Sequence, residues 1–226
     1  MAWVFHVRSS NQDMVEALRR RGIVRCSRVD AALRSVDRRF YCPSRSYEDA
    51  EQPLGIGDTT VPAPRTVALE LEMLSEVCFP GARVLDIACG SGYVTSLLAG
   101  LVGDRGLVVG LDSDHVLVEH AARNIRTEHP GLLESGSVKV LCPAAPLSEG
   151  FPYYAPYNAI HVGAAVPDHA PAELLQQLIP GGRLVLAVDY GAQGQFLETL
   201  DRGTAGAVER RVLATCSRPL LAGLCA

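Results

Sequence analysis

The sequence predicts an α/β fold in which a doubly wound, mostly parallel sheet follows a helical extension at the N-terminus. The chain has 226 residues, of which 48% are apolar and 20% charged, which is enough apolar material for one sizeable core. From residue 82 onward, short apolar runs alternate with segments of helical periodicity. This alternation is typical of right-handed β-α-β crossovers, and hence of a Rossmann-like parallel sheet covered by helices on both faces.

The extension, residues 1–65, predicts two helices and a long loop. Ser10 and Asp13 are spaced as in a capping box and mark the start of a helix that ends near Gly22. A second helix is expected over residues 28–36. The segment SRSYEDAEQPLGIGDTTVPAP (44–64) is rich in glycine, proline and polar residues. A long irregular segment inside a compact domain is commonly functional or mobile.

The sequence pattern of residues 66–226 predicts the α/β core, which forms one domain together with the extension. Helices are expected over residues 66–77, 93–102, 115–129 and 171–179, and strands over 82–88, 106–112, 137–142, 157–163 and 181–188. Ligands of such sheets bind beyond the carboxyl ends of the strands. The loops that follow the strands are therefore where a functional site is expected.

A glycine loop follows the first strand of this alternation, in VLDIACGSGYV (84–94). Gly90 and Gly92 permit a sharp turn and let a ligand lie against bare backbone, towards which the next helix directs free N–H groups. A nicotinamide fingerprint needs its third glycine where Tyr93 stands. A nucleophile elbow needs its first glycine where Cys89 stands. Both of these sites are therefore disfavoured.

A carboxylate at the end of the next strand completes the pattern. Asp112, twenty residues after Gly92, can accept hydrogen bonds from both hydroxyls of a ribose. Asp86 lies within reach of the same loop and can accept a hydrogen bond or favour a positive charge. Together with the later turn PGGRLVLAV, the loop and the acid indicate S-adenosylmethionine as the cofactor and the fold of a class I methyltransferase. One alternative stays open, in which Asp86 and Asp112 only cap helices.

Composition and charge disfavour several other classes of function. The net charge of −4 argues against a dedicated nucleic-acid binder, and no apolar run approaches the ~18 residues of a membrane span. The seven cysteines lie without CxxC pairs or histidines at zinc spacing, so no metal site is expected. Their odd number and the lack of a signal-peptide pattern favour reduced thiols in the cytoplasm. A monomer is expected.

Over nearly its whole length the sequence resembles the protein-L-isoaspartate (D-aspartate) O-methyltransferases. The resemblance is carried by LRRRGIV, VDRRFYCP, QPLGIG, VLDIACGSGY, GLVVGLD, NIRTEHPGLLESG, APYNAIHVGAAVP and LIPGGRLVLAV. YNAIHVGAA followed by PGGRLVLAV is the most specific part. The resemblance implies that a methyl group passes from S-adenosylmethionine to the α-carboxyl of L-isoaspartyl residues in damaged proteins. The products are S-adenosylhomocysteine and an ester that collapses to a succinimide, which is the basis of protein repair.

The resemblance also implies roles for individual residues. The loop that holds the methionine part of the cofactor corresponds to Asp86, Ala88, Cys89, Gly90, Ser91 and Gly92. Asp112 corresponds to the ribose acid, Ser113 to the approach to the adenine, and Ala144 and Ala145 to a loop beside the adenine amino group. The residues 161–163 correspond to the rim of the sheet below the substrate carboxylate. The resemblance also suggests that the last strands of the chain lie centrally in the sheet.

Two departures from the family pattern concern the chemistry. The substrate loop of the family reads T-[IV]-S-x-P, and here Pro62 stands where its serine hydroxyl lies near the reacting carboxylate. Thr60 is then the nearest candidate hydroxyl. Ala144 replaces the carboxylate that meets the adenine, which predicts weakened cofactor binding. Three functions stay open: the repair methyltransferase, a cofactor-binding relative with weak or no activity that serves as a binding module, and a methyltransferase for another small acceptor.

Overall fold

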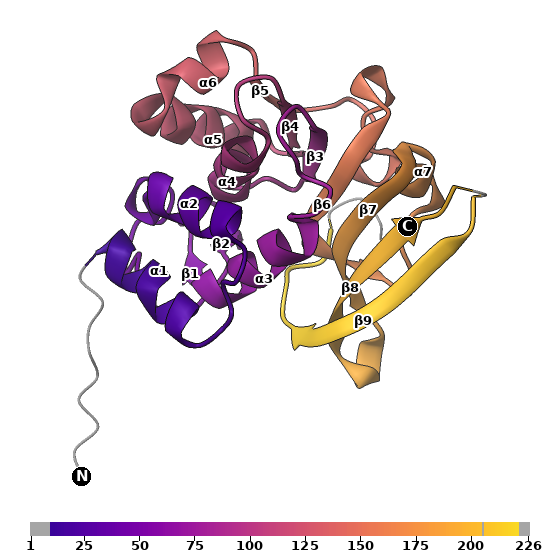
Figure 1. The fold of residues 1–226 in the computed structure, drawn as a ribbon, viewed down its shortest axis with the longest axis horizontal. Coiled ribbons are helices and arrows are strands. Elements are labelled where there is room, and N and C mark those ends of the chain that lie inside the picture. The colour runs from indigo at the N-terminus through magenta and orange to yellow at the C-terminus, as the bar shows by residue number, and fades with distance from the viewer. Residues whose placement is uncertain (1–9, 205, 222–226) are drawn as a thin grey trace.

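The computed structural model describes residues 10–204 and 206–221, and within them a seven-stranded sheet forms the centre of the fold (Figure 1). Its strand order is β5-β4-β3-β6-β7-β8-β9. The strands are β3 (Arg83–Ile87), β4 (Leu107–Leu111), β5 (Val138–Leu141), β6 (Tyr157–Pro167), β7 (Leu178–Asp189), β8 (Gln195–Arg202) and β9 (Val208–Cys216). Strands β3 to β7 pair in parallel, whereas β8 and β9 are antiparallel to their neighbours. The predicted α/β fold with a mostly parallel sheet is confirmed.

The helices alternate with the parallel strands as the periodicity predicts. They are α1 (Asn11–Arg20), α2 (Ser27–Ser35), α3 (Pro64–Leu74), α4 (Tyr93–Val102), α5 (His115–Glu128), α6 (Pro130–Glu134) and α7 (Ala172–Gln176). Short 3₁₀ turns cover Arg38–Phe40, Leu147–Glu149, Pro152–Tyr154 and Gly191–Gln193. Neighbouring residues of β3 belong to different hydrophobic cores. Val84 belongs to the core that includes residues of the helices α1 to α5, and Leu85 belongs to the core on the opposite face, with Leu174 of α7. Both faces of the sheet are therefore buried, as parallel sheets require.

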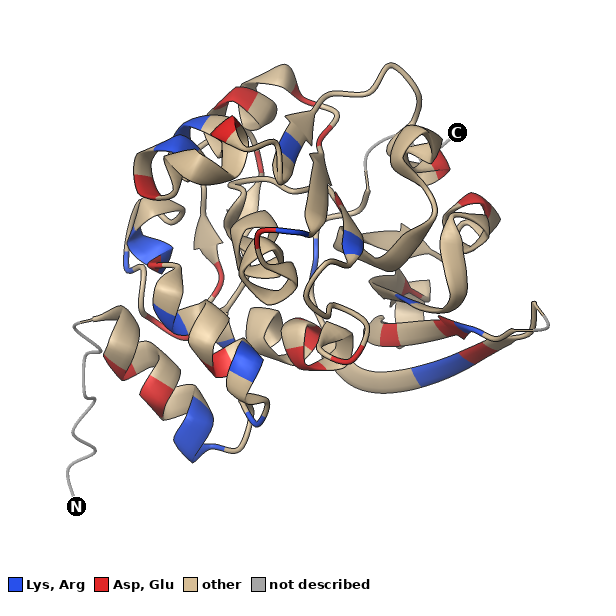
Figure 2. Ribbon diagram, turned by 45° about the horizontal axis from the view of Figure 1, so that its top comes forward, with Lys and Arg blue, Asp and Glu red and all other residues tan. Residues whose placement is uncertain are grey.

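The N-terminal helix begins and ends where the sequence places its caps. The hydroxyl of Ser10 accepts a hydrogen bond from the backbone N–H of Asp13 at 3.1 Å, and Gly22 follows the C-cap with φ +69°. Its outer face carries charges of both signs, as Figure 2 shows, and Nε of Arg20 lies 3.0 Å from Oε1 of Glu16. The inner face of α1 packs against α2 and α3. The extension is thus a small helical layer beside the sheet.

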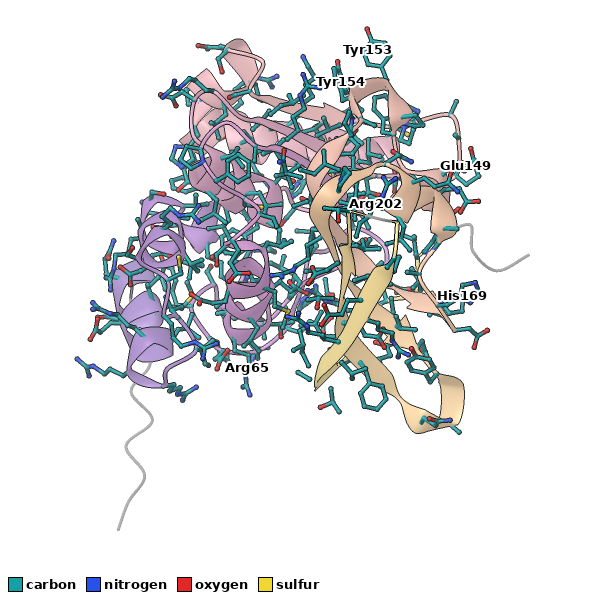
Figure 3. All side chains as sticks on the ribbon, turned by 45° about the vertical axis from the view of Figure 1, so that its right-hand side comes forward. Arg65, Glu149, Tyr153, Tyr154, His169 and Arg202 are labelled. Atoms are coloured by element: carbon teal, nitrogen blue, oxygen red, sulfur yellow. The ribbon has the colours of Figure 1, made fainter. Side chains whose placement is uncertain are left out.

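The segment 44–64, expected to be a loop, contains a short antiparallel pair of β1 (Gln52–Pro53) and β2 (Thr60–Val61). Asp49 fastens this segment to the start of α3. Its Oδ1 accepts a hydrogen bond from the backbone N–H of Arg65 at 3.1 Å, and its Oδ2 lies 3.2 Å from Nε of the same arginine. Arg65 lies at the outer surface (Figure 3). The substrate loop suggested by the resemblance is therefore held against the start of α3 by an ion pair.

The last two strands are the main departure from expectation. The central arrangement suggested for them is wrong, because β8 pairs with the outer side of β7 and β9 with the outer side of β8. An antiparallel hairpin at the edge of a sheet can follow the last crossover without displacing any parallel strand. None of the helices in the described residues is both long and apolar enough to cross a membrane.

Candidate functional site

A cavity of about 310 Å³ opens at the carboxyl ends of β3, β4 and β6. Its size is within the ~300–1,000 Å³ of small-molecule sites. Its walls include Asp58, Thr59, Thr60, Pro62, Asp86, Ala88, Cys89, Gly90, Ser91, Asp112, Ser113, Leu117, Leu147, His161, Gly163 and Arg218. Most of the residues singled out in the sequence are thus brought together here from four separate segments. The edge of the sheet at which they meet is the one that the topology predicts.

The glycine loop is shaped by three residues in the left-handed region and by two close contacts. Ala88, Gly90 and Gly92 have φ of +57°, +52° and +81°. A Cβ on Gly92 would lie 3.1 Å from Cβ of Ala121, so this glycine lets α4 approach α5. A Cβ on Gly163 would lie 2.6 Å from the carbonyl oxygen of Ala88, so β6 can run directly under the loop only without a side chain there.

Asp112 directly follows β4 beside the glycine loop and lines the cavity. Its Oδ2 accepts a hydrogen bond from the backbone N–H of Gly90 at 3.0 Å, which joins the acid to the loop. The residue is 5% exposed. Burial raises the pKa of Asp112, while backbone N–H groups, that of Gly90 first, oppose the rise. The carboxylate is therefore fixed at the edge of the cavity and still lines it.

The alternative in which the two acids only cap helices is wrong. The N-cap of α4 is Gly92, and the N-cap of α5 is Asp114, whose Oδ1 accepts from the backbone N–H of Val116 at 2.8 Å. Asp86 is instead fully buried, and its Oδ2 accepts a hydrogen bond from the hydroxyl of Thr95 at 2.5 Å. Its other oxygen is 2.7 Å from Nδ1 of His161 on β6. Asp86 therefore supports the floor of the cavity.

Below the cavity lies a buried cluster of four charged side chains, Asp86, His161, Glu70 and Arg218. Nε2 of His161 is 3.4 Å from Oε2 of Glu70, an electrostatic contact without the alignment of a hydrogen bond. Nη2 of Arg218 donates to Oε1 of Glu70. Burial would raise the pKa of Glu70, but the charges of Arg218 and His161 lower it to about 2. Glu70 is therefore ionised inside the protein.

Glu70 and Arg218 are functional candidates that were not predicted from the sequence. Glu70 lies on the buried face of α3 together with Val67, Ala68, Leu71 and Leu74. A carboxylate among apolar residues at helical spacing is a signal, because an unpaired charge is rarely buried. Its partner lies 148 residues further along the chain, and no local pattern connects the two.

The folding stability is expected to fall as pH rises from 6.5 to about 9 because of His161. Burial would lower its pKa, but the hydrogen bond to Asp86 and the charge of Glu70 raise it from 6.5 to about 9. Because the folded pKa exceeds the unfolded one, the stabilisation is complete below pH 6.5 and is lost as pH rises through about 9. Its full size is about 3 kcal/mol.

Urea unfolding at pH 6, 8 and 10 measures this stabilisation. The free energy of unfolding of the wild type should fall more steeply between pH 6 and 10 than that of His161→Gln. His115→Gln, at an exposed histidine, should follow the wild type. Parallel pH profiles for the wild type and His161→Gln would contradict the assignment.

The remaining predicted residues lie at different depths. Thr60 and Pro62 line the cavity, but the hydroxyl of Thr60 donates to Oε1 of Glu51. Ser113 is exposed at the rim. Ala144 and Ala145 are exposed and lie outside the cavity lining, so their assignment to the cofactor stays a prediction.

Comparisons with known proteins identify the family of the chain. Residues 9–218 match the sequence model of the family described as Protein-L-isoaspartate(D-aspartate) O-methyltransferase. The chain is 37% identical over 205 residues to a protein-L-isoaspartate O-methyltransferase of Caenorhabditis elegans, covering 91% of this chain and 89% of the relative. It is 38% identical over 202 residues to protein-L-isoaspartate O-methyltransferase 1 of Arabidopsis thaliana, covering 88% of this chain and 86% of the relative.

A solved structure extends the agreement to three dimensions. A Plasmodium falciparum structure assigned to protein-L-isoaspartate O-methyltransferase, in complex with S-adenosyl-L-homocysteine, has a TM-score of 0.85 to this chain at 27% identity. The similarity covers 94% of this chain and 98% of that one. The family resemblance of the sequence is confirmed by these matches. The chain belongs to the protein-L-isoaspartate(D-aspartate) O-methyltransferase family.

Proposed function

We propose that the chain transfers the methyl group of S-adenosylmethionine to the α-carboxylate of L-isoaspartyl residues in damaged proteins, as a step of their repair. The observation that carries this proposal is a single cavity that joins the glycine loop and Asp112 to the segment Asp58–Pro62 and to His161. Family membership supports the same cofactor and acceptor. The relatives are named as methyltransferases, so the alternative of a silent binding module gains no support from them.

The residues around the glycine loop fit the cofactor. Gly90 presents bare backbone to the cavity, with Cγ2 of Thr59 at 3.7 Å as the nearest atom to a Cβ placed there. Asp112 can accept the ribose hydroxyls at the end of β4, and Leu117 and Leu147 offer apolar walls to an aromatic base. When bound, S-adenosylmethionine supplies a methyl group on a positively charged sulfur. The loop residues bind and orient this donor through backbone groups.

The acceptor needs alignment more than activation. A carboxylate with an ordinary pKa near 4 is already ionised at neutral pH, so no general base is required. The chain must bring it into line with the methyl carbon and exclude water. Pro62 offers no hydroxyl for this purpose, but its fixed φ stiffens the cavity wall ahead of α3. Preorganisation of the wall therefore replaces part of what a hydroxyl would contribute.

A methyl-transfer assay tests the proposal. The expected result is turnover of an isoaspartyl peptide at saturating S-adenosylmethionine and none of the same peptide with normal aspartate. Calorimetry with S-adenosylhomocysteine measures cofactor binding separately. Binding without turnover of the isoaspartyl peptide would restore the binding module, and turnover of other carboxylates or hydroxyls alone would favour another small acceptor.

Pro62→Ser is expected to raise kcat by about 2- to 10-fold, which is the worth of one added hydrogen bond to the acceptor. The change places a hydroxyl on the cavity wall and is measured with the isoaspartyl peptide. Ala63→Ser, which adds a hydroxyl one residue further along, is the matched control and should leave kcat unchanged. An unchanged kcat in Pro62→Ser would assign the alignment to Thr60 or to the fixed shape of the segment.

We further propose that the protein acts as a monomer in the cytoplasm and binds neither nucleic acid nor membranes. The net charge is −4, and residues of both charge signs are interspersed along the ribbon in Figure 2, which favours a polypeptide substrate over a polyanion. The six cysteines in the described residues are free thiols, as in a reducing compartment. Light scattering tests whether the protein is a monomer, and a nucleic-acid binding assay tests whether it binds nucleic acid.

A further inference from the structure

Arg218 is a buried cation at the end of the cavity opposite Asp112. Asp112 follows β4, whereas Arg218 lies next to β6, and β3 with its glycine loop runs between the two. Backbone hydrogen bonds tie the following residues to β6, from Ala165 N to Pro219 O at 2.8 Å and from Leu221 N to Ala165 O at 2.7 Å. The guanidinium is therefore held at the β6 end by a segment that pairs with the sheet.

Glu70 fixes the direction of the guanidinium and leaves part of it free. Nη2 of Arg218 donates to Glu70, and the two side chains are 4% and 2% exposed. Among the described residues, no acceptor takes a hydrogen bond from Nε or Nη1 of Arg218. Nε and Nη1 are not among the unpaired side-chain atoms that are completely buried. The residue also lines the cavity. A planar guanidinium with two unused donors facing a cavity can bind a second carboxylate.

The two carboxylates of the buried cluster are already engaged by protein partners. Both oxygens of Asp86 are occupied by Thr95 and His161, and the oxygens of Glu70 face Arg218 and His161. All four carboxylate oxygens thus point at protein donors or cations. Asp86 and His161 line the cavity too, but their polar atoms face protein partners, whereas Nε and Nη1 of Arg218 have no hydrogen-bond acceptor among the described residues. A ligand at the β6 end therefore meets hydrogen-bond donors.

We propose that Arg218 binds the carboxylate of the isoaspartyl residue and that Glu70 is the positioning residue that aims its guanidinium. The inference rests on the proposed function and names the donor that holds the acceptor where Pro62 supplies none. Negative charge on the carboxylate falls as the methyl group is transferred, so the ion pair is stronger before transfer than during it. Arg218 therefore contributes to binding and to the selection of carboxylates more than to turnover.

The test compares two peptides on protein saturated with S-adenosylhomocysteine. One carries an isoaspartyl residue, and the other is identical except that this α-carboxylate is a carboxamide. The wild type should bind the carboxylate at least about tenfold more tightly, as expected for a hydrogen-bonded charge. In the double variant Arg218→Met/Glu70→Gln, which leaves no unpaired buried charge, the preference should vanish. Arg218→Lys should retain part of it, and Arg105→Met, at an exposed arginine, all of it.

The kinetic readout separates a binding role from a structural one. The double variant should raise KM for the isoaspartyl peptide about tenfold or more while kcat changes less than threefold and the Kd for S-adenosylhomocysteine stays constant. An undiminished carboxylate preference in the double variant, or no preference in the wild type, would overturn the inference. If the carboxylate preference depends on Arg218 but the protein transfers no methyl group, the proposed function is overturned and the assignment of Arg218 stands.

Discussion

Asp112→Asn is expected to raise the Kd for S-adenosylhomocysteine roughly 10- to 150-fold, because a hydrogen bond to a charged acceptor contributes about 1.5–3 kcal/mol. The change keeps the shape of the side chain and an oxygen for the backbone N–H of Gly90, which now lies 3.0 Å from Oδ2. The loss would therefore report on the ribose hydroxyls rather than on a disordered loop. Calorimetry on the folded protein gives the Kd directly.

The control for this change is Asp104→Asn, at an exposed acid on the turn before β4. It should leave the Kd unchanged while altering the net charge by the same amount. Thermal unfolding of the cofactor-free variants shows whether either change disturbs the fold. If Asp112→Asn binds as tightly as the wild type, the proposed assignment of Asp112 to the ribose is wrong.

Arg218→Met is expected to lower the free energy of unfolding by about 3–5 kcal/mol, the usual cost of removing one partner of a buried ion pair. Glu70 would be left 1% exposed with its carboxylate facing only His161. Such a loss is a large fraction of the 5–15 kcal/mol that stabilises a typical domain. Urea unfolding at pH 7 measures it.

The double variant Arg218→Met/Glu70→Gln should recover most of this loss, because it removes the charge that would otherwise remain buried. The coupling in the double-mutant cycle then gives the strength of the pair. Arg105→Met, on the exposed turn between α4 and β4, should stay within about 0.5 kcal/mol of the wild type. A single variant as stable as the wild type would mean that solvent reaches Glu70.

Most of the fold and the meeting of the glycine loop with Asp112 at one cavity could be predicted because their signals are local. Helix α4 was predicted over residues 93–102 and is found at Tyr93–Val102, since a glycine loop precedes it and Gly103 follows it. The acid at Asp112 follows its strand directly, so its place at the rim followed from strand polarity alone. The strands β8 and β9 were not predicted as an antiparallel edge, because their order depends on pairing between distant segments.

The sequence by itself determined the parallel sheet, the glycine loop and its strand-end acid, and the family to which the chain belongs. These features follow from short-range periodicity and from residues a few positions apart. Only the tertiary structure decided the β6 end of the cavity, where α3, β6 and the segment after β9 bring Glu70, His161 and Arg218 into one cluster. Charges this far apart in the chain can be buried only as partners, and partnership is a property of the fold that no single segment carries.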